Sequence, residues 1–296
     1  MLTFQGLYER FQKITSDDST DNVTFGKALI NETQKLVCSL KNWSFAEETN
    51  TSTSSAGQQS VKLPVNYRRL ITVNVTSGGV KYTPSEVSNQ MTFDKLNAQG
   101  TSVTSDFPSY FHIREGALLL YPAISSASLT ITTVSLIRPI DMTAADYTTG
   151  TVSAIANGAV AITGSGTTWT AAMVGRYIRI TSEGQWYKIA TRVSDTAITI
   201  DKPYEGTTIA AGSEAYTIGQ LPIVPEEFED LLWLRPVAIY YMMKGEETKS
   251  NFYMKEYKDM LIDLRNQYQS QTTQNAFGIF GELNVPNVND YPLNIS

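Results

Sequence analysis

Apolar positions recur at helical spacing near the start of the chain. Between residues 24 and 43 they predict an amphipathic helix, and the polar stretch 17–22 can cap its beginning. A shorter helix is expected over residues 4–14. Residues 47–60 hold few apolar positions and many Thr, Ser, Gly and Gln, so we expect a loop that leads into the first core strand.

From residue 60 to 138 the pattern alternates as it does in β-strands. A Ser-Gly-Gly turn at 77–79 separates two of the alternating runs, and a short helix is expected within 84–97. The strands are expected at 69–75, 80–82, 111–114, 117–121 and 129–136.

The region from Thr148 to Gly219 has a different character, with short alternating runs separated by Gly, Ser and Thr turns between two helix-rich flanks. The run 151–163 predicts a hairpin around Asn157-Gly158, and 177–189 predicts a second hairpin through 182–184. Runs at 197–200 and 215–218 complete a set suited to a small barrel or sandwich. We therefore expect an inserted all-β domain, in which no catalytic group is evident.

Two further helices are expected after the insertion. Pro225 and the acids that follow it suit a first helical turn, the apolar run to Met243 indicates a largely buried helix, and Pro236 is expected to kink it. The second helix is expected over 248–269. Its apolar stripe indicates core or subunit packing rather than a ligand site, and consists of Phe252, Tyr253, Tyr257, Met260, Leu261 and Leu264.

The final segment, residues 270–296, contains no Lys or Arg and only Glu282 and Asp290 as acids. Uncharged segments with spaced apolar anchors and prolines are suited to lie extended along another surface. We expect an extended docking arm; an arm packed on its own domain is the alternative. The predicted docking residues are Phe277, Ile279, Phe280, Leu283, Val285, Val288, Tyr291, Leu293 and Ile295.

Together these patterns predict an α+β fold. The body of helices and β-sheet is expected to comprise residues 1–147 and 220–269, with the inserted β domain at 148–219 and the arm at 270–296. The chain has 296 residues, of which 42% are hydrophobic and 18% charged, as in folded soluble proteins of two domains. Because neither a leader segment nor an apolar run of roughly 18 residues is present, neither export nor membrane residence is expected.

Little in the sequence suggests catalysis. Cys38 is the only cysteine and His112 the only histidine, which excludes intrachain disulfides, Cys/His zinc sites and His-based triads. We expect Cys38 to be a buried, inert thiol and His112 a strand residue near a surface or subunit contact. The only catalytic candidates are scattered carboxylates such as Glu226, Glu227 and Glu229, which fit a helix start without any chemistry, although a glycosidase-type carboxylate pair stays open on the sequence. No catalytic residue, cofactor or metal site is therefore predicted.

Several longer motifs carry a resemblance. Residues 164–175, 186–190 and 201–206 resemble a β module of tailed-bacteriophage virion proteins, particularly those of the head-to-tail neck. Residues 63–70, 79–87 and 118–123 are similar to the body of phage head-tail adaptor, or connector, proteins.

This resemblance implies a structural virion protein at the head-tail junction, assembled in the cytoplasm of a bacterial host. The implied partners are further copies of itself in a dodecameric ring, the portal protein, and tail or nozzle proteins, with fibres as possible partners of the insertion. Genomic DNA would pass through the ring without sequence-specific binding. The net charge of −6 agrees with this role, because acidic surfaces repel the duplex.

The sequence is also compatible with a second function. A tail fibre-associated or carbohydrate-binding β protein could use Trp169, Trp186, Tyr187 and Tyr204 of the insertion as stacking platforms. Such a role would leave the helices and the arm unexplained. Aromatic residues of small β domains also pack more often in the core.

Overall fold

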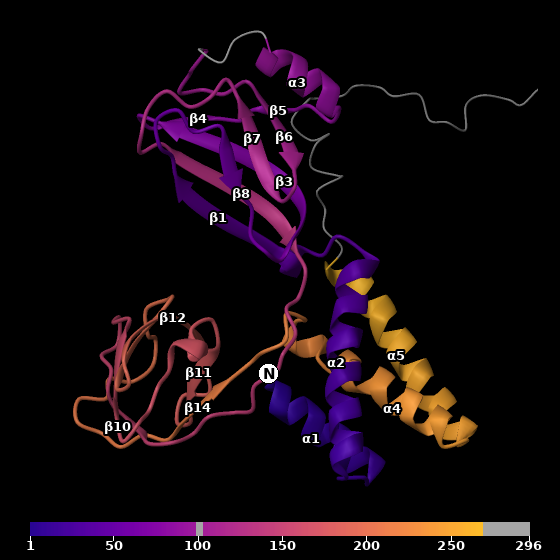
Figure 1. The fold of residues 1–296 in the computed structure, drawn as a ribbon. Helices are drawn as coiled ribbons and strands as arrows, with labels where there is room; N and C mark the ends of the chain where they lie inside the picture. Colours follow the sequence, from indigo (N-terminus) through magenta and orange to yellow (C-terminus); the bar gives the residue numbers. More distant parts are fainter. Residues whose placement is uncertain (99–102, 269–296) are drawn as a thin grey trace, which may run out of the picture.

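The chain folds into a group of helices, a β-sandwich and a β-barrel (Figure 1). The computed structural model describes residues 1–98 and 103–268. Both the helices and the all-β insertion of the expected α+β fold are present. Each of the three parts surrounds its own cluster of buried apolar side chains.

The helical hub consists of α1 (Phe4–Thr15), α2 (Thr20–Leu40), α4 (Leu231–Met243) and α5 (Glu247–Tyr268). Its core joins the two ends of the described chain, because apolar side chains of α1 and α2 pack against those of α4 and α5. The buried members include Phe4, Phe11, Ile30, Val37, Leu231, Val237, Tyr257 and Leu264.

The helix boundaries differ from the expected ones for local reasons. Helix α2 begins at Thr20 rather than residue 24, since the Ser19 hydroxyl caps it by accepting from the Asn22 amide at 3.4 Å. It ends at Leu40, where the Trp43 indole folds back and donates to the Val37 carbonyl at 2.7 Å. The expected helix start at Pro225 is instead a short 3₁₀ turn, Glu226–Phe228, and α4 follows at Leu231.

The β-sandwich packs two four-stranded sheets face to face, with strand orders β1-β8-β3-β4 and β2-β7-β6-β5. The first sheet contains β1 (Glu47–Thr53), β8 (Thr130–Ile137), β3 (Tyr67–Ser77) and β4 (Val80–Tyr82). The second contains β2 (Ser60–Lys62), β7 (Ala117–Tyr121), β6 (Tyr110–Arg114) and β5 (Ser85–Glu86). The short helix expected within 84–97 is α3 (Gln90–Ala98), beside β6.

The expectation of a loop from residue 47 is wrong, because Glu47–Thr53 is strand β1. It pairs antiparallel with β8 at all seven positions. The sequence gives no apolar alternation because β1 is an outer strand whose exposed side chains alternate with half-buried ones. Its threonines still favour the extended backbone.

The insertion is a small barrel of six strands in the order β14-β11-β12-β13-β10-β9. The strands are β9 (Thr151–Ala154), β10 (Ala161–Ser165), β11 (Tyr177–Ile180), β12 (Trp186–Ser194), β13 (Ala197–Ile200) and β14 (Tyr216–Gly219). Paired backbone hydrogen bonds between Val152 and Glu214, at 2.9 and 3.1 Å, close the sheet on itself. Of the two architectures expected, the barrel is the one formed.

The two expected hairpins of the insertion have different outcomes. Strands β11 and β12 pair as expected, with Tyr177 opposite Lys188. Strands β9 and β10 also pair, but the first pair is Ala154 and Thr163, so Asn157-Gly158 lies in a longer connection rather than in a two-residue hairpin turn. The backbone of Ile155 instead exchanges two hydrogen bonds with the backbone of Ile209. These bonds add to the closure of the barrel, and Ile155 therefore does not pair with β10.

Candidate interaction site

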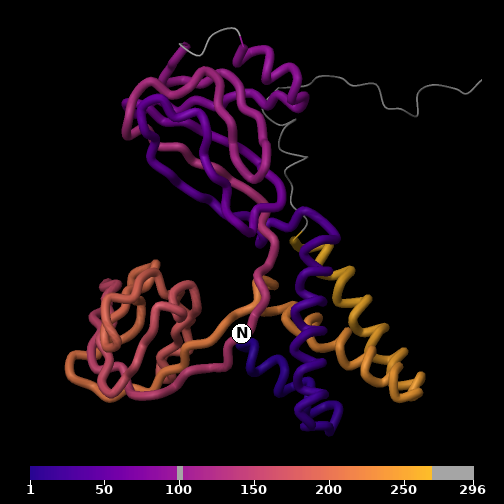
Figure 2. Tube along the Cα trace, in the orientation of Figure 1, coloured from indigo at the N-terminus to yellow at the C-terminus, as the bar shows by residue number. Residues whose placement is uncertain are grey.

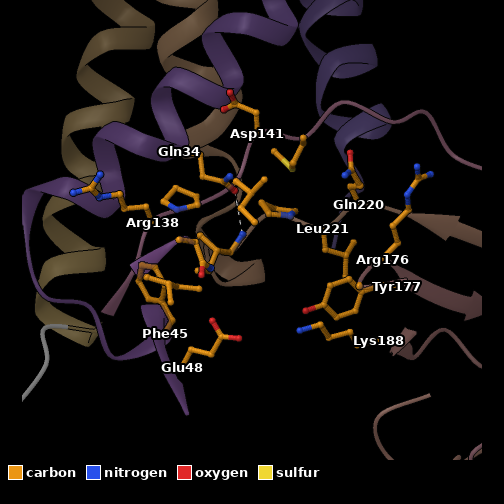
Figure 3. Close-up of a pocket in the computed structure, with 18 of the residues that line it drawn as sticks. Gln34, Phe45, Glu48, Arg138, Asp141, Arg176, Tyr177, Lys188, Gln220 and Leu221 are labelled. Atoms are coloured by element: carbon orange, nitrogen blue, oxygen red, sulfur yellow. Dashed lines mark hydrogen bonds between the residues drawn. The ribbon is translucent and has the colours of Figure 1, made fainter. Parts of the chain in front are cut away.

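The three parts of the fold meet around one cavity of about 490 Å³ (Figure 3). Its walls come from α2, the start of β1, the barrel, and the two linkers that connect the barrel to the rest of the chain. Figure 2 shows the chain passing from the sandwich to the barrel alongside the hub and then returning to the hub. This junction positions the insertion.

The outgoing linker, residues 138–146, is fixed to helix α2. The Asn31 side chain makes two hydrogen bonds with the Met142 backbone: its Nδ2 donates to the carbonyl at 2.9 Å, and its Oδ1 accepts from the amide at 2.8 Å. One turn further along the helix, Lys35 pairs with Asp141 at 2.5 Å. The linker is therefore held against the helix over consecutive residues.

The returning linker, residues 219–224, is fixed to the same elements by two glutamines. Gln220 Oε1 accepts from the amides of Thr143 and Ala144, both at 2.7 Å, which ties the two linkers together. The Gln220 carbonyl accepts from the Phe4 amide at 2.8 Å, at the start of α1. Gln34 of α2 accepts from the Ile223 amide at 3.1 Å.

At the base of the barrel, Asp146 connects the insertion to the beginning of α1. The Thr3 hydroxyl donates to Asp146 Oδ2 at 2.8 Å, and the Asp146 amide donates to Gln5 Oε1 at 2.8 Å. Burial raises the pKa of the Asp146 carboxyl, while the hydrogen bond from Thr3 opposes the shift. A Cβ at position 219 would collide with Thr3 Cγ2 and lie 2.8 Å from Asp146 Oδ1, so a larger residue than Gly219 would displace the Thr3–Asp146 pair.

Charged side chains of both signs line the cavity. Glu48 lines it from β1, and Arg176 and Lys188 line it from the barrel, with the Glu48 and Lys188 side chains on the same side of the close-up (Figure 3). Burial raises the pKa of the Tyr177 hydroxyl, and the charges of Asp201 and Glu48 add to this effect. Because acids and bases are mixed on the walls, the cavity suits contact with protein surface rather than capture of a phosphate, for which a wall of one sign is needed.

The three glutamates considered as catalytic candidates all make structural contacts. Glu226 pairs with the Met1 ammonium, and Glu229 accepts from the Leu2 amide at 2.7 Å. Glu227 accepts from the Tyr268 hydroxyl, and this hydrogen bond holds the pKa of the Glu227 carboxyl below its usual range. All three contacts tie α1 or α5 to the turn that precedes α4.

The aromatic residues considered for carbohydrate stacking do not form an exposed platform. Trp169 and Tyr204 are each 1% exposed, and Tyr187 is 5% exposed. Trp186 is partly exposed, but the Arg179 guanidinium lies 4.8 Å from its ring centre. Trp169, Tyr187 and Tyr204 thus pack in the barrel core, as expected for aromatic residues of a small β domain, whereas Trp186 lies outside it.

Cys38 and His112 are engaged in packing. Cys38 is buried, and its burial raises the pKa of the thiol to about 12. His112 Nδ1 lies 2.7 Å from the Val87 carbonyl, and its ring stacks on Phe93 at 5.5 Å between ring centres. On α5, Tyr257, Leu261 and Leu264 are buried as expected, whereas Phe252 faces solvent at 58% exposure.

The predicted docking residues from Phe277 to Ile295 lie outside the described residues. Within residues 1–98 and 103–268, the structure groups no three His, Cys, Asp or Glu side chains in a way that could hold a metal ion. None of the helices in these residues has the length and apolar character needed to cross a bilayer.

The polar residues of the junction were not found by sequence reasoning. Thr3, Asn31, Asp146 and Gln220 look like ordinary surface residues in the sequence, and the junction partners of their side chains lie 76 to 143 positions away. Only the change of pattern near residue 148 marks the place where such anchors are needed.

A comparison with protein families gives the class of the protein. Residues 2–162 match the model of the SU10 adaptor protein family, and this match spans the first two hub helices, the sandwich, the outgoing linker and the first strand of the barrel. The chain belongs to this family and is a structural adaptor protein of the phage type. No curated protein matches the chain significantly.

Proposed function

We propose that this adaptor forms a ring between the portal and the tail of a phage virion. The observation that carries the proposal is the family membership over residues 2–162. Further support comes from the division of the fold, since the hub, sandwich and barrel offer separate surfaces for neighbouring copies and for tail components. In this assembly the protein is a component of the head-tail junction.

The firm attachment of the barrel to the hub supports a platform role. A flexible tether would leave the barrel free to rotate, whereas here both linkers are hydrogen-bonded to α1, α2 and each other. Each copy would therefore present its barrel at a defined angle, and tail or fibre proteins would meet a regular array of barrels. The described contacts do not favour carbohydrate binding, because Trp169, Tyr187 and Tyr204 are core residues and the Arg179 guanidinium stacks on Trp186.

The charge balance suits a conduit for DNA. The net charge of −6 per chain, repeated around a ring, disfavours adhesion to phosphate, whereas basic surfaces bind DNA by releasing counterions. Genomic DNA would then pass without specific contacts.

The ring itself is tested by mass photometry and negative-stain imaging of the purified chain, alone and after mixing with purified portal. We expect closed rings, with twelve copies as the expected stoichiometry, in at least one of the two samples. A chain that stays monomeric in both samples over the micromolar range would contradict the proposal.

The segment 270–296 is proposed as the arm that docks on the portal. Its anchors are apolar and the segment holds no Lys or Arg, so docking would depend on burial and main-chain hydrogen bonds and would change little with salt. Deleting Thr272–Ser296 should leave the helical circular dichroism intact and abolish co-sedimentation with portal.

A charge-matched pair of variants separates burial from general repulsion. Phe277→Asp with Phe280→Asp should weaken portal binding strongly, since burying an unpaired carboxylate is costly. Asn284→Asp with Asn287→Asp adds the same charge at polar positions and should bind nearly as the parent chain does. Undiminished binding of the phenylalanine variant would rule out the docking arm, and unfolding of the truncated body would favour an arm packed on its own domain.

A further inference from the structure

The first sandwich sheet has two open edges that face away from each other. Its strand order is β1-β8-β3-β4, and among the described residues no strand pairs with the outer side of β1 or of β4. Every pair in this sheet is antiparallel, so β1 and β4 run in opposite directions. If a second copy placed its β1 beside β4, the alternation of strand direction would continue unbroken.

Apart from Glu47 and Glu48 at its start, strand β1 lacks the features by which proteins protect an open sheet edge. It carries no Pro, Lys or bulge, and its register with β8 is continuous from Glu47 to Thr53. The Ser54 amide donates to the Leu129 carbonyl at 2.9 Å, which sets the alternation of the ladder. By that alternation, the backbone amides and carbonyls of Thr49, Thr51 and Thr53 point to the open side.

Strand β4 presents a complementary open edge. A two-residue turn at Gly78-Gly79, both with positive φ, joins it to β3, so Ser77 and Val80 form the closing pair and Lys81 directs its backbone groups outward. By the register of this pair, the Val80 side chain lies on the same inner face of the sheet as the buried Val75 side chain, yet Val80 is 60% exposed.

A cavity of about 280 Å³ lies beside β1 at the other end of the same sheet. Asn50 and Ser52 line it from β1, and Val61, Leu63 and Pro64 line it from the second sheet. The buried Nδ2 atom of Asn50 has no hydrogen-bond partner among the described residues. The sandwich is thus incompletely filled at the edge where β1 lies, while an apolar side chain is exposed at the edge where β4 lies.

We propose that β4 of one copy adds to β1 of the next, so that the sheet continues from subunit to subunit. The exposed Val80 would then lie against the apolar wall of the neighbour's cavity, and both open edges would be paired. The contact is head-to-tail, and such contacts close into rings when the rotation between copies allows it. This inference rests on the ring of the proposed function and assigns the surface that joins its copies.

Cysteine cross-linking tests the pairing directly. Side chains of Thr49, Thr51, Thr53 and Lys81 lie on the outer face of the sheet, and facing Cβ atoms of adjacent strands are roughly 5 Å apart. Lys81→Cys is combined in turn with cysteine at 49, 51 or 53 in the assembled ring. Background from Cys38 should be small because that thiol is buried.

We expect one of the three double variants to give a ladder of disulfide-linked oligomers under oxidation, while each single variant stays monomeric on denaturing gels. A cross-link in Thr51→Cys alone would indicate two-fold pairing of β1 with β1 and would overturn the head-to-tail proposal. Intact rings that give no cross-link in any double variant would also overturn it, while leaving the ring in place. If the parent chain forms no ring, alone or with portal, the proposed function itself fails.

A proline variant gives a second readout. Thr51→Pro removes an outward amide without disturbing the bonds to β8, whereas Thr51→Ala keeps that amide and serves as the control. We expect Thr51→Pro to weaken ring assembly at least tenfold by mass photometry while its circular dichroism stays like that of the parent. Assembly equal to that of Thr51→Ala would contradict the inference.

Discussion

Replacing Asn31 by alanine should loosen the outgoing linker and destabilise the hub. The change removes both hydrogen bonds to the Met142 backbone, and the Met142 residue is 4% exposed, so water cannot readily replace them. An unsatisfied buried amide or carbonyl costs about 1–3 kcal/mol. For two such groups at a partly buried site we expect a loss of about 3 kcal/mol.

The loss can be measured by urea denaturation followed by circular dichroism, since the hub contains α1, α2, α4 and α5 and dominates the helical signal. With a denaturant slope of about 2–3 kcal/mol per molar urea, the midpoint should fall by roughly 1 M. Hydrogen exchange at the Met142 amide should accelerate by about 100-fold, because each 1.4 kcal/mol is a factor of about ten.

Two control variants separate the hydrogen bonds from other effects. Asn31→Asp keeps the acceptor for the Met142 amide but loses the donor, so its midpoint should lie between those of the parent and the alanine variant. Thr24→Ala changes an exposed position of the same helix and should shift the midpoint little. An Asn31→Ala variant with unchanged midpoint and unchanged exchange at Met142 would refute the anchoring role.

Three further outcomes are expected. Replacing residues 151–218 by a short Gly/Ser linker should leave a soluble remainder with its helical signal, because Tyr147 and Ile218 exchange backbone bonds of 2.9 and 2.8 Å and the two ends are adjacent; aggregation would show that the insertion is not separable. Tyr216→Phe should destabilise the barrel by about 2 kcal/mol in thermal melts monitored by tryptophan fluorescence, since the hydroxyl accepts from Trp169 at 2.9 Å and donates to the Thr149 carbonyl at 2.6 Å; an unchanged melt would contradict this. Asp146→Asn should reduce the pH dependence of stability, because burial raises the folded-state pKa of this carboxyl and its ionisation therefore disfavours folding as the pH rises. The urea midpoint of the parent should accordingly rise relative to that of the variant as the pH falls toward about 4. A difference between the two midpoints that does not change with pH would contradict this.

Local sequence patterns correctly predicted the elements in which apolar side chains recur on one buried face. The hub helices and the β11–β12 hairpin follow from apolar periodicity and turn residues, and both form near the expected residues. Strand β1 was missed because its partner β8 lies more than 75 positions away and its own side chains are polar. Its strand character comes from backbone pairing, which leaves no mark in the hydrophobic pattern.

The same limit applies to the junction and to barrel closure. The bond from Thr3 to Asp146 spans 143 positions, and closure depends on Ile209 and Glu214, which lie outside any alternating run. Hydrogen bonds between polar residues far apart in the sequence depend on how the parts of the fold pack against each other. That packing leaves no trace in the local spacing of apolar residues. The docking role of the arm residues from Phe277 onward stays a prediction.

The way the barrel is attached has a mechanical consequence. Its chain enters at Tyr147 and leaves at Ile218 as two neighbouring strands, so a pulling force on the barrel would reach the hub through both at once. Gln220 bridges the two segments. Asn31 and Thr3 connect the outgoing segment to α2 and to the start of α1, and the bonds of the Phe4 amide to the Gln220 carbonyl and of the Ile223 amide to Gln34 do the same for the returning one. Tension would therefore be divided between α1 and α2 before it reached the shared apolar core. A force on the barrel would therefore be distributed over the whole helical bundle rather than over one peptide segment.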